Sequence, residues 1–145
     1  MQPIQIQPIG IIHSCFKEKF ATPRQPGLVT AASAQVELIA PYNLADAVEG
    51  LVEFSHIWLT FAFHQTAQQG WKPKVRPPRL GGNAKLGVFA TRSTFRPNPL
   101  GLSLVKLDSI DTNKGVILHV SGADLIEGTP IIDIKPYLPY SDAHP

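Results

Sequence analysis

Proline and glycine recur so often along this chain that long helices have little room. Its 145 residues include fourteen prolines and eleven glycines. Proline lacks the backbone N–H that an interior helical turn needs, and glycine loses more conformational freedom than any other residue when it is ordered. The segments between these residues are short, and they favour strands joined by turns.

Several of these segments alternate apolar and polar residues, the pattern of half-buried strands. In 55–64 (SHIWLTFAFH) every second residue is apolar, which places Ile57, Leu59, Phe61 and Phe63 on one face. Other strands are predicted at 2–12, 31–39, 86–91, 102–110, 115–121 and 131–137, with a short helix at 43–49, a hairpin turn at 113–115 and a long loop at 65–84. Many short strands with turn signals between them predict a mainly β fold, an antiparallel barrel or sandwich with short helices and long Pro/Gly-rich loops.

The overall composition is typical of a globular protein and not of a disordered or membrane-spanning one. With 43% hydrophobic and 17% charged residues, the chain is expected to form a single globular domain over 1–145. No apolar run approaches the roughly 18 residues of a membrane span, and the N-terminus lacks the basic region of a signal peptide, so a cytoplasmic location is expected. The single cysteine, Cys15, excludes an internal disulfide and is expected to be buried, and the five histidines show no metal-ligand spacing.

The charge distribution is more informative than the net charge of +2. No Asp or Glu occurs between Glu53 and Asp108, yet eight of the thirteen basic residues lie in that stretch: Lys72, Lys74, Arg76, Arg79, Lys85, Arg92, Arg96 and Lys106. Such clustering is expected of a protein that binds a phosphate-bearing partner, although a merely solvated basic face gives the same pattern.

Four loops combine proline or glycine with polar side chains that are suited to binding. They are 19–27, 75–83, 91–101 and 122–130, the last followed by the DIKPY segment at 133–137. The arginines of 75–83 are planar donors suited to phosphate. Asn98 can hydrogen-bond an adenine edge, and the acidic residues of 122–130 can accept from an amine or a ribose. Asp133 and Lys135 are equally consistent with a surface ion pair. A glycine-rich G-x-G-x-x-G turn, the usual nucleotide fingerprint, is absent.

Seven segments, in order, closely resemble the TrmO family, also called YaeB or TsaA-like. They are PRQPGL at 23–28, FSHIWL at 54–59, RPPRLGGN at 76–83, GVFATRS at 87–93, RPNPLGLS at 96–103, DLIEGTP at 124–130 and DIKPY at 133–137. The resemblance runs from about residue 9 to 142. Many members of the family continue past DIKPY into a small C-terminal domain, so this chain is expected to hold the barrel domain without it.

The resemblance implies a small antiparallel β-barrel that binds S-adenosylmethionine and forms a homodimer, with the cofactor near the subunit interface. It also implies methylation of N6 of threonylcarbamoyl-adenosine beside the tRNA anticodon. By motif, the cofactor contacts fall at Pro23, Arg24, Gln25, His64, Gln65, Arg92, Leu102, Asp124, Leu125, Ile126 and Glu127. The anticodon-loop phosphates are expected at Arg76, Arg79, Lys85 and Arg96. Trp71 and Phe95 are available for base stacking, although core packing is the simpler role for Phe95.

Transfer of a methyl group from a sulfonium is an in-line displacement, so much of the catalysis is positioning. An acceptor that bonds the N6 hydrogen would turn the nitrogen lone pair toward the methyl. The candidates are Asn98, Asp133 and Tyr137, and the sequence does not choose among them. Two alternatives stay open: a cofactor- or RNA-binding module without turnover, and a methyltransferase with a small-molecule acceptor.

Overall fold

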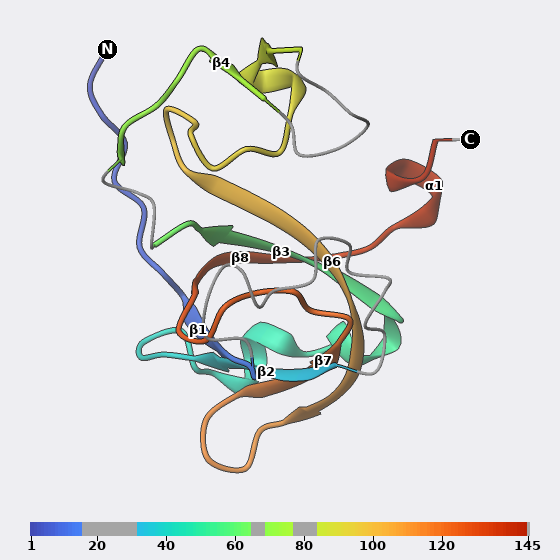
Figure 1. The fold of residues 1–145 in the computed structure, drawn as a ribbon. Helices are drawn as coiled ribbons and strands as arrows, with labels where there is room; N and C mark the ends of the chain where they lie inside the picture. Colours follow the sequence, from blue (N-terminus) through green and yellow to red (C-terminus); the bar gives the residue numbers. More distant parts are fainter. Residues whose placement is uncertain (16–31, 65–68, 77–83, 145) are drawn as a thin grey trace.

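The computed structural model describes residues 1–15, 32–64, 69–76 and 84–144. Six strands close into a barrel in the order β1-β2-β7-β6-β3-β8, and all neighbouring pairs are antiparallel (Figure 1). Their bounds are β1 (Gly10–His13), β2 (Ser33–Leu38), β3 (His56–Ala62), β6 (Leu100–Asp111), β7 (Ile117–Ser121) and β8 (Pro130–Pro136). Two short strands, β4 (Lys74–Val75) and β5 (Leu86–Gly87), form a separate sheet. The mainly β fold and the antiparallel barrel are confirmed.

The alternation of the sequence sets the inside of the barrel. On β3 the residues Ile57, Leu59 and Phe61 are buried, as predicted from the period of two. On β6 the inward residues are Ser103, Val105 and Leu107. The residues that alternate with them, Leu102, Leu104 and Lys106, point outward. The same rule on the other strands adds Ile12, Ala34, Val36, Leu38, Leu118, Val120 and Ile131 to one continuous core.

Several segments fold differently from the sequence prediction. The strand expected at 86–91 is only two residues long, because the chain turns at once into the 3-10 helix η6 (Val88–Ala90). The strand expected at 2–12 begins only at Gly10, after Pro3 and Pro8, which cannot donate to a ladder. The described part of the loop expected at 65–84 contains β4. Cys15 is exposed, so its predicted burial is wrong.

The remaining helices are single turns. The helix expected at 43–49 is the 3-10 turn η3 (Ala45–Val48), and η4 (Leu51–Glu53) follows directly after Gly50, whose φ is +85°. The short helix α1 (Pro139–Asp142) is fixed to the outside of β3, since Asp142 Oδ2 accepts from Trp58 Nε1 at 3.0 Å. None of the helices in the described ranges is long and apolar enough to cross a bilayer.

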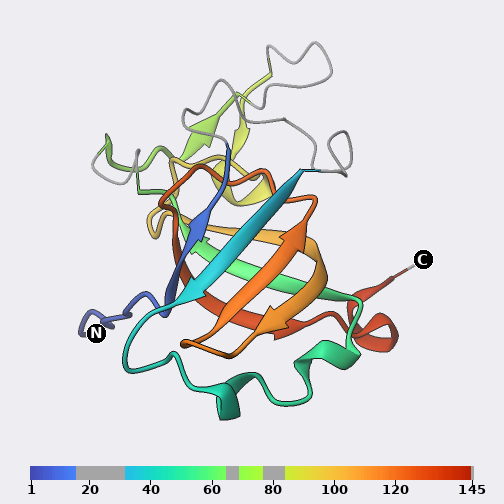
Figure 2. The ribbon, with the colours of Figure 1, turned by 90° about the horizontal axis from the view of Figure 1, so that it is seen from below.

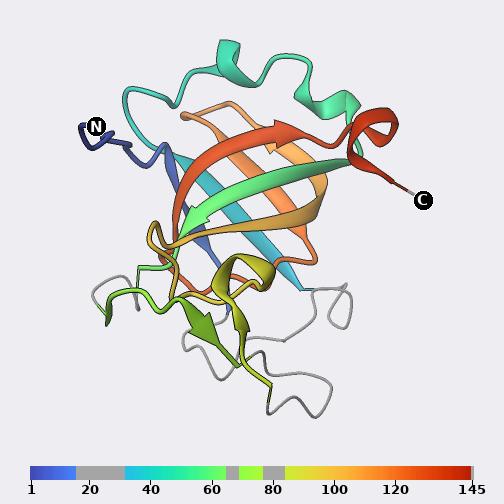
Figure 3. The ribbon, with the colours of Figure 1, turned by 90° about the horizontal axis from the view of Figure 1, so that it is seen from above.

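The strand register gives the barrel two different ends. At one end, which we call the loop end, Ala62 pairs with Leu100 and Phe61 with Ile131, so β3 finishes where β6 and β8 begin. The β4–β5 sheet lies beyond this end, whereas η3 and η4 lie at the opposite one, the helical end (Figure 2, Figure 3). Segments 91–99 and 122–129, which hold most of the predicted site residues, are both at the loop end.

Candidate functional site

Hydrogen bonds from its main-chain N–H groups hold the loop at 122–129, between β7 and β8, against neighbouring segments. The N–H of Gly122 donates to Ala32 O (3.0 Å), and that of Gly128 donates to Ile12 O (2.9 Å). Both glycines have positive φ, of +79° and +83°, which side-chain-bearing residues rarely adopt. The Oγ1 of Thr129 closes the turn by donating to Ile126 O at 2.6 Å. The predicted cofactor residues 124–127 therefore lie on an ordered loop.

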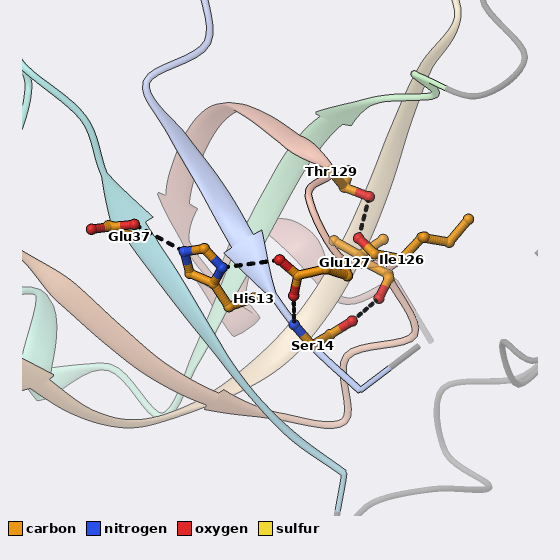
Figure 4. A network of polar contacts seen from close by, with 7 residues as sticks. His13, Ser14, Glu37, Ile126, Glu127 and Thr129 are labelled. Carbon is orange, nitrogen blue, oxygen red and sulfur yellow. Dashed lines mark hydrogen bonds and ion pairs between the residues drawn. The ribbon is translucent and has the colours of Figure 1, made fainter. Parts of the chain in front are cut away.

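A histidine and a serine from the end of β1 fasten this loop to the barrel (Figure 4). Nε2 of His13 lies 2.9 Å from Oε1 of Glu37, and Nδ1 lies 3.1 Å from Oε2 of Glu127. The Ser14 N–H donates to Glu127 Oε1 (2.8 Å), and its hydroxyl donates to Leu125 O (2.6 Å). The hydrogen bond to Glu37, followed by that to Glu127, raises the pKa of His13 above its ordinary value. We call His13, Ser14, Glu37 and Glu127 the His13 clamp.

Asp124 is the partly buried acid of the loop. The Ser103 hydroxyl donates to its Oδ1 at 3.2 Å. Burial, which disfavours the charged form, raises the pKa of Asp124 even though the Ser103 bond acts in the opposite direction. A cation placed beside this carboxylate would be favoured, because it would offset the cost of burying the charge.

The 91–99 segment leads into β6 and is braced by one arginine. Nη1 of Arg96 donates to the carbonyls of Thr91 (2.6 Å) and Val88 (3.1 Å). Arg96 also lies over the Phe89 ring, 5.8 Å from its centroid. Arg92 and Asn98 are exposed on the same segment. Arg96 therefore shapes this loop, while Arg92 and Asn98 are accessible from solvent.

A basic hollow of about 460 Å³ lies against the β4–β5 sheet. We define it by its lining residues, Lys72, Lys74, Val75, Arg76, Lys85, Ser93 and Phe95. Of these, Arg76 and Lys85 are predicted RNA contacts and Phe95 a possible stacking partner. Lys72 and Lys74 are not among the predicted contacts, although their spacing of two residues continues to Arg76. The only sequence signal that includes these two lysines is the acid-free stretch itself.

Comparison with known proteins identifies the family. The family model of the tRNA-methyltransferase O (TrmO) N-terminal domain matches residues 11–143. The chain belongs to the TrmO family. A crystal structure of TrmO superposes with a TM-score of 0.82 at 48% sequence identity, covering 99% of this chain and 61% of that one.

Two relatives of this TrmO-family chain carry names that describe a function. The tRNA (adenine(37)-N6)-methyltransferase of Escherichia coli (strain K12) is 60% identical over 146 residues, which cover 100% of this chain and 62% of the relative. A probable S-adenosyl-L-methionine-binding protein of Pyrococcus abyssi is 40% identical over 136 residues, covering 94% of this chain and 69% of the relative. The chain thus spans about three fifths of the length of the E. coli relative.

The structure gathers part of the predicted site at the loop end of the TrmO barrel. His64 lies two residues past the end of β3. Between them, the Phe63 N–H donates to Pro99 O at 2.9 Å, which ties that strand end to the segment of Asn98. The predicted residues at this end are His64, Arg92, Asn98, Asp124, Leu125, Ile126 and Glu127. Pro23, Arg24, Gln25, Gln65 and Arg79 lie outside the described residues.

Other predicted residues are not brought to this group within one chain. Leu102 lies on the outer face of β6, with 43% of its surface exposed, whereas the neighbouring Ser103 points inward to Asp124. Asp133 pairs with Thr60 in the middle of β3 and forms an ion pair with Lys135 at 2.7 Å. Tyr137 lies at the helical end, where its N–H donates to His56 O. Among the described residues there is no cluster suited to a metal ion.

Proposed function

We propose that this chain is an S-adenosylmethionine-dependent methyltransferase that methylates N6 of threonylcarbamoyl-adenosine beside the anticodon of tRNA. The observation that carries the proposal is the 60% identity, over the whole chain, to a relative named tRNA (adenine(37)-N6)-methyltransferase. The TM-score of 0.82 to a TrmO crystal structure supports it, because the barrel that would hold the site is the same.

The loop end fits the cofactor by charge. S-adenosylmethionine carries a positive amine and a sulfonium, and when bound it supplies a methyl group whose leaving group is neutral. The carboxylate of Asp124 is partly buried, with a raised pKa, and Glu127 is held close by on the same loop. A bound cation would stabilise the charged form of Asp124. We propose Asp124, Leu125, Ile126, Glu127, Arg92 and His64 as cofactor contacts of the described part of the chain.

For the acceptor, Asn98 is the candidate that we favour. It is exposed at the loop end, and its segment is rigid because Arg96 braces it and because Asn98 O accepts from the Leu100 N–H at 2.7 Å. Its side-chain oxygen can accept a hydrogen bond from the N6 amine and so direct the nitrogen lone pair away from the ring. Positioning of this kind lowers the barrier. The N6–methyl bond forms as the sulfur–methyl bond breaks, the neutral thioether leaves, and the methylated nitrogen then releases its proton to solvent. Asp133 and Tyr137 would reach the same site only from a second subunit.

A homodimer is therefore part of the proposal. The outer face of β6 and β3 presents Leu102, Leu104 and Trp58 side by side, and Leu102 is 43% exposed. If the cofactor lies between two subunits, as the family resemblance implies, an outward Leu102 can contact cofactor bound to the partner. Arg76 and Lys85 would bind the tRNA phosphates, with Arg79 and Arg96 assisting. Because the substrate is tRNA, we propose a cytoplasmic location for the enzyme.

The test is methyl transfer from labelled S-adenosylmethionine to total tRNA, followed by nucleoside analysis. Label in N6-methyl threonylcarbamoyl-adenosine is the expected result. Asn98→Ala should reduce the turnover by about 10²-fold or more while cofactor binding, measured by calorimetry, stays unchanged. Asn98→Asp keeps an acceptor in place and serves as the matched variant.

The second candidate function is a cofactor-binding module without turnover. The observation that favours it is the Pyrococcus abyssi relative, which is named for binding and of which this chain covers 69%. Tight cofactor binding with no label in any tRNA nucleoside would decide for this function.

A further inference from the structure

The short β4–β5 ribbon brings like charges together. Its register pairs Lys74 with Gly87 and Val75 with Leu86. The residues that flank the last of these pairs, Arg76 after β4 and Lys85 before β5, both line the basic hollow, as does Lys74. Like charges gathered at one end of a two-stranded sheet repel each other and are destabilising. The fold of the ribbon alone gives no reason for this arrangement.

Among the described residues, no acidic side chain pairs with these charges. The sequence from 54 to 107 contains no Asp or Glu. Within the described ranges, none of the cations of the hollow forms an ion pair with a carboxylate. Lys72 is held at the wall by Phe95, since its N–H donates to Phe95 O (3.0 Å) and its Nζ lies 4.2 Å from the ring centroid. The hollow therefore has a positive lining whose positions are set by the fold.

The hollow also has room for a ligand. Opposite Lys74 the ribbon carries Gly87, and a Cβ built there would meet no atom within 4 Å. The φ of Gly87 is −55°, a value that any residue can adopt, so its backbone does not demand glycine. A volume of about 460 Å³ is in the range of small-ligand sites. Its wall also contains Ser93 and the partly exposed Phe95.

We propose that the basic hollow binds one backbone phosphate of single-stranded RNA, with the adjoining base packed against Phe95. This inference rests on the proposed function, because it assumes that RNA is the acceptor. Arg76 offers planar paired donors that match phosphate oxygens, and the lysines 72, 74 and 85 add positive charge around them. Aromatic rings beside such groups are the usual platform for unstacked bases in RNA-binding proteins. The site is distinct from the loop at 122–129, which is acidic.

The sharpest test is Gly87→Glu, which places a carboxylate opposite Lys74. The probe is a labelled single-stranded RNA with the sequence of an anticodon loop, titrated at several salt concentrations. We expect Gly87→Glu to weaken binding at least tenfold and to flatten the dependence of affinity on salt, since fewer phosphates are neutralised. Gly87→Gln, of the same size but uncharged, should weaken binding much less.

A charge-matched control is available on the far side of the barrel. Lys114→Gln, in the hairpin turn between β6 and β7, lowers the net charge by one, as Gly87→Glu does, and should leave RNA binding nearly unchanged. Phe95→Leu should weaken binding severalfold without altering the salt dependence, because it removes a base contact and not a charge. Equal losses for Gly87→Glu and Lys114→Gln would overturn the proposal, as would RNA binding that none of the hollow variants changes.

Two further readouts separate this proposal from the proposed function. Calorimetry with S-adenosylmethionine should give the same affinity for Gly87→Glu and the unsubstituted chain, which shows that the variant folds. RNA binding that is sensitive to Gly87→Glu, without methyl transfer to tRNA, would support the hollow and contradict the methyltransferase. Methyl transfer to tRNA that Gly87→Glu leaves unchanged would support the methyltransferase and overturn the hollow.

Discussion

The barrel and the β4–β5 ribbon are built in opposite ways. The barrel encloses a continuous apolar core from six strands, in which Ile57, Leu59 and Leu118 are wholly buried. The ribbon has two residues per strand, and its buried side chain, Val75, lies outside that core cluster, as does Val88 of the adjoining η6 turn. The barrel can therefore carry the stability of the domain, while the ribbon is free to hold charges that repel one another. Stability and ligand recognition commonly divide between scaffold and loops in this way.

The largest expected contrast comes from truncating one buried side chain in each region. Leu59→Ala in β3 should lower the free energy of unfolding by about 2–5 kcal/mol, because it leaves a cavity in a closed core. Val75→Ala, in the ribbon, removes less apolar surface beside a hollow and should cost well under half of that. Chemical denaturation of both variants measures the difference. Similar losses would mean that the ribbon is part of the cooperative core.

Glycine offers the next contrast. At Gly101, on β6, a Cβ would lie within 2.8 Å of Phe63 and closer still to Phe61, whose rings pack edge-to-face at a centroid distance of 5.2 Å. Gly101→Ala should therefore cost about 1–3 kcal/mol by overpacking. Gly87→Ala, in the ribbon, meets open space at an ordinary φ and should be neutral or slightly stabilising. Thermal unfolding of the pair would show whether only the barrel glycine is sterically required.

The His13 clamp predicts a pH dependence at the barrel's loop end. The pKa of His13 is raised in the folded state by Glu37 and Glu127, so its contribution to stability is complete below its ordinary pKa of about 6.5 and is lost as pH rises through the folded value. Its side chain is 44% exposed, so we expect an effect of no more than about 1 kcal/mol. Between about pH 5.5 and 8.5, the free energy of unfolding should depend less on pH in His13→Gln than in the unsubstituted chain. An unchanged pH dependence would contradict the clamp.

Asp124 should also make stability fall as pH rises, but over a more acidic pH range than His13. Its raised pKa means that its folded form holds a proton more tightly than the unfolded chain does, so stability declines as pH rises from about 3.8 through the folded pKa. Saturating S-adenosylmethionine should reduce this decline if the cofactor's positive charge lies beside the carboxylate. The measurement is unfolding against pH with and without cofactor, and Asp124→Asn should remove the difference.

The smallest expected effect is a gain in stability, whereas the barrel substitutions are expected to lower it. Lys85→Gln removes one of the like charges gathered around the basic hollow and should raise stability by about a few tenths of a kcal/mol. The gain should shrink at high salt, because salt screens exposed charges. Loss of stability on this substitution would mean that Lys85 has a favourable partner, and the contrast with the barrel would then be weaker than we infer.

Much of the barrel could be predicted from the sequence because its evidence is local. The alternation in 55–64 and 102–110 identified both the strands and the faces that become the core, and the turn at 113–115 was also right: Gly115 has a φ of +101°. The weak points were the segments where proline or a loop residue interrupts the pattern, as at 2–12 and 86–91. Cys15 was misplaced because its burial was inferred from the residue type alone, and a single residue carries no periodicity.

The sequence by itself determined the strand faces, the acid-free basic stretch and the family motifs, since each of these is written in neighbouring residues. Only the tertiary structure decided which of them meet. Barrel closure joins His13 to Glu127 across 114 positions and places Asn98 and Tyr137 at opposite ends of β3. The physical reason is that pairing across a closed sheet depends on register among all six strands, which no local pattern specifies.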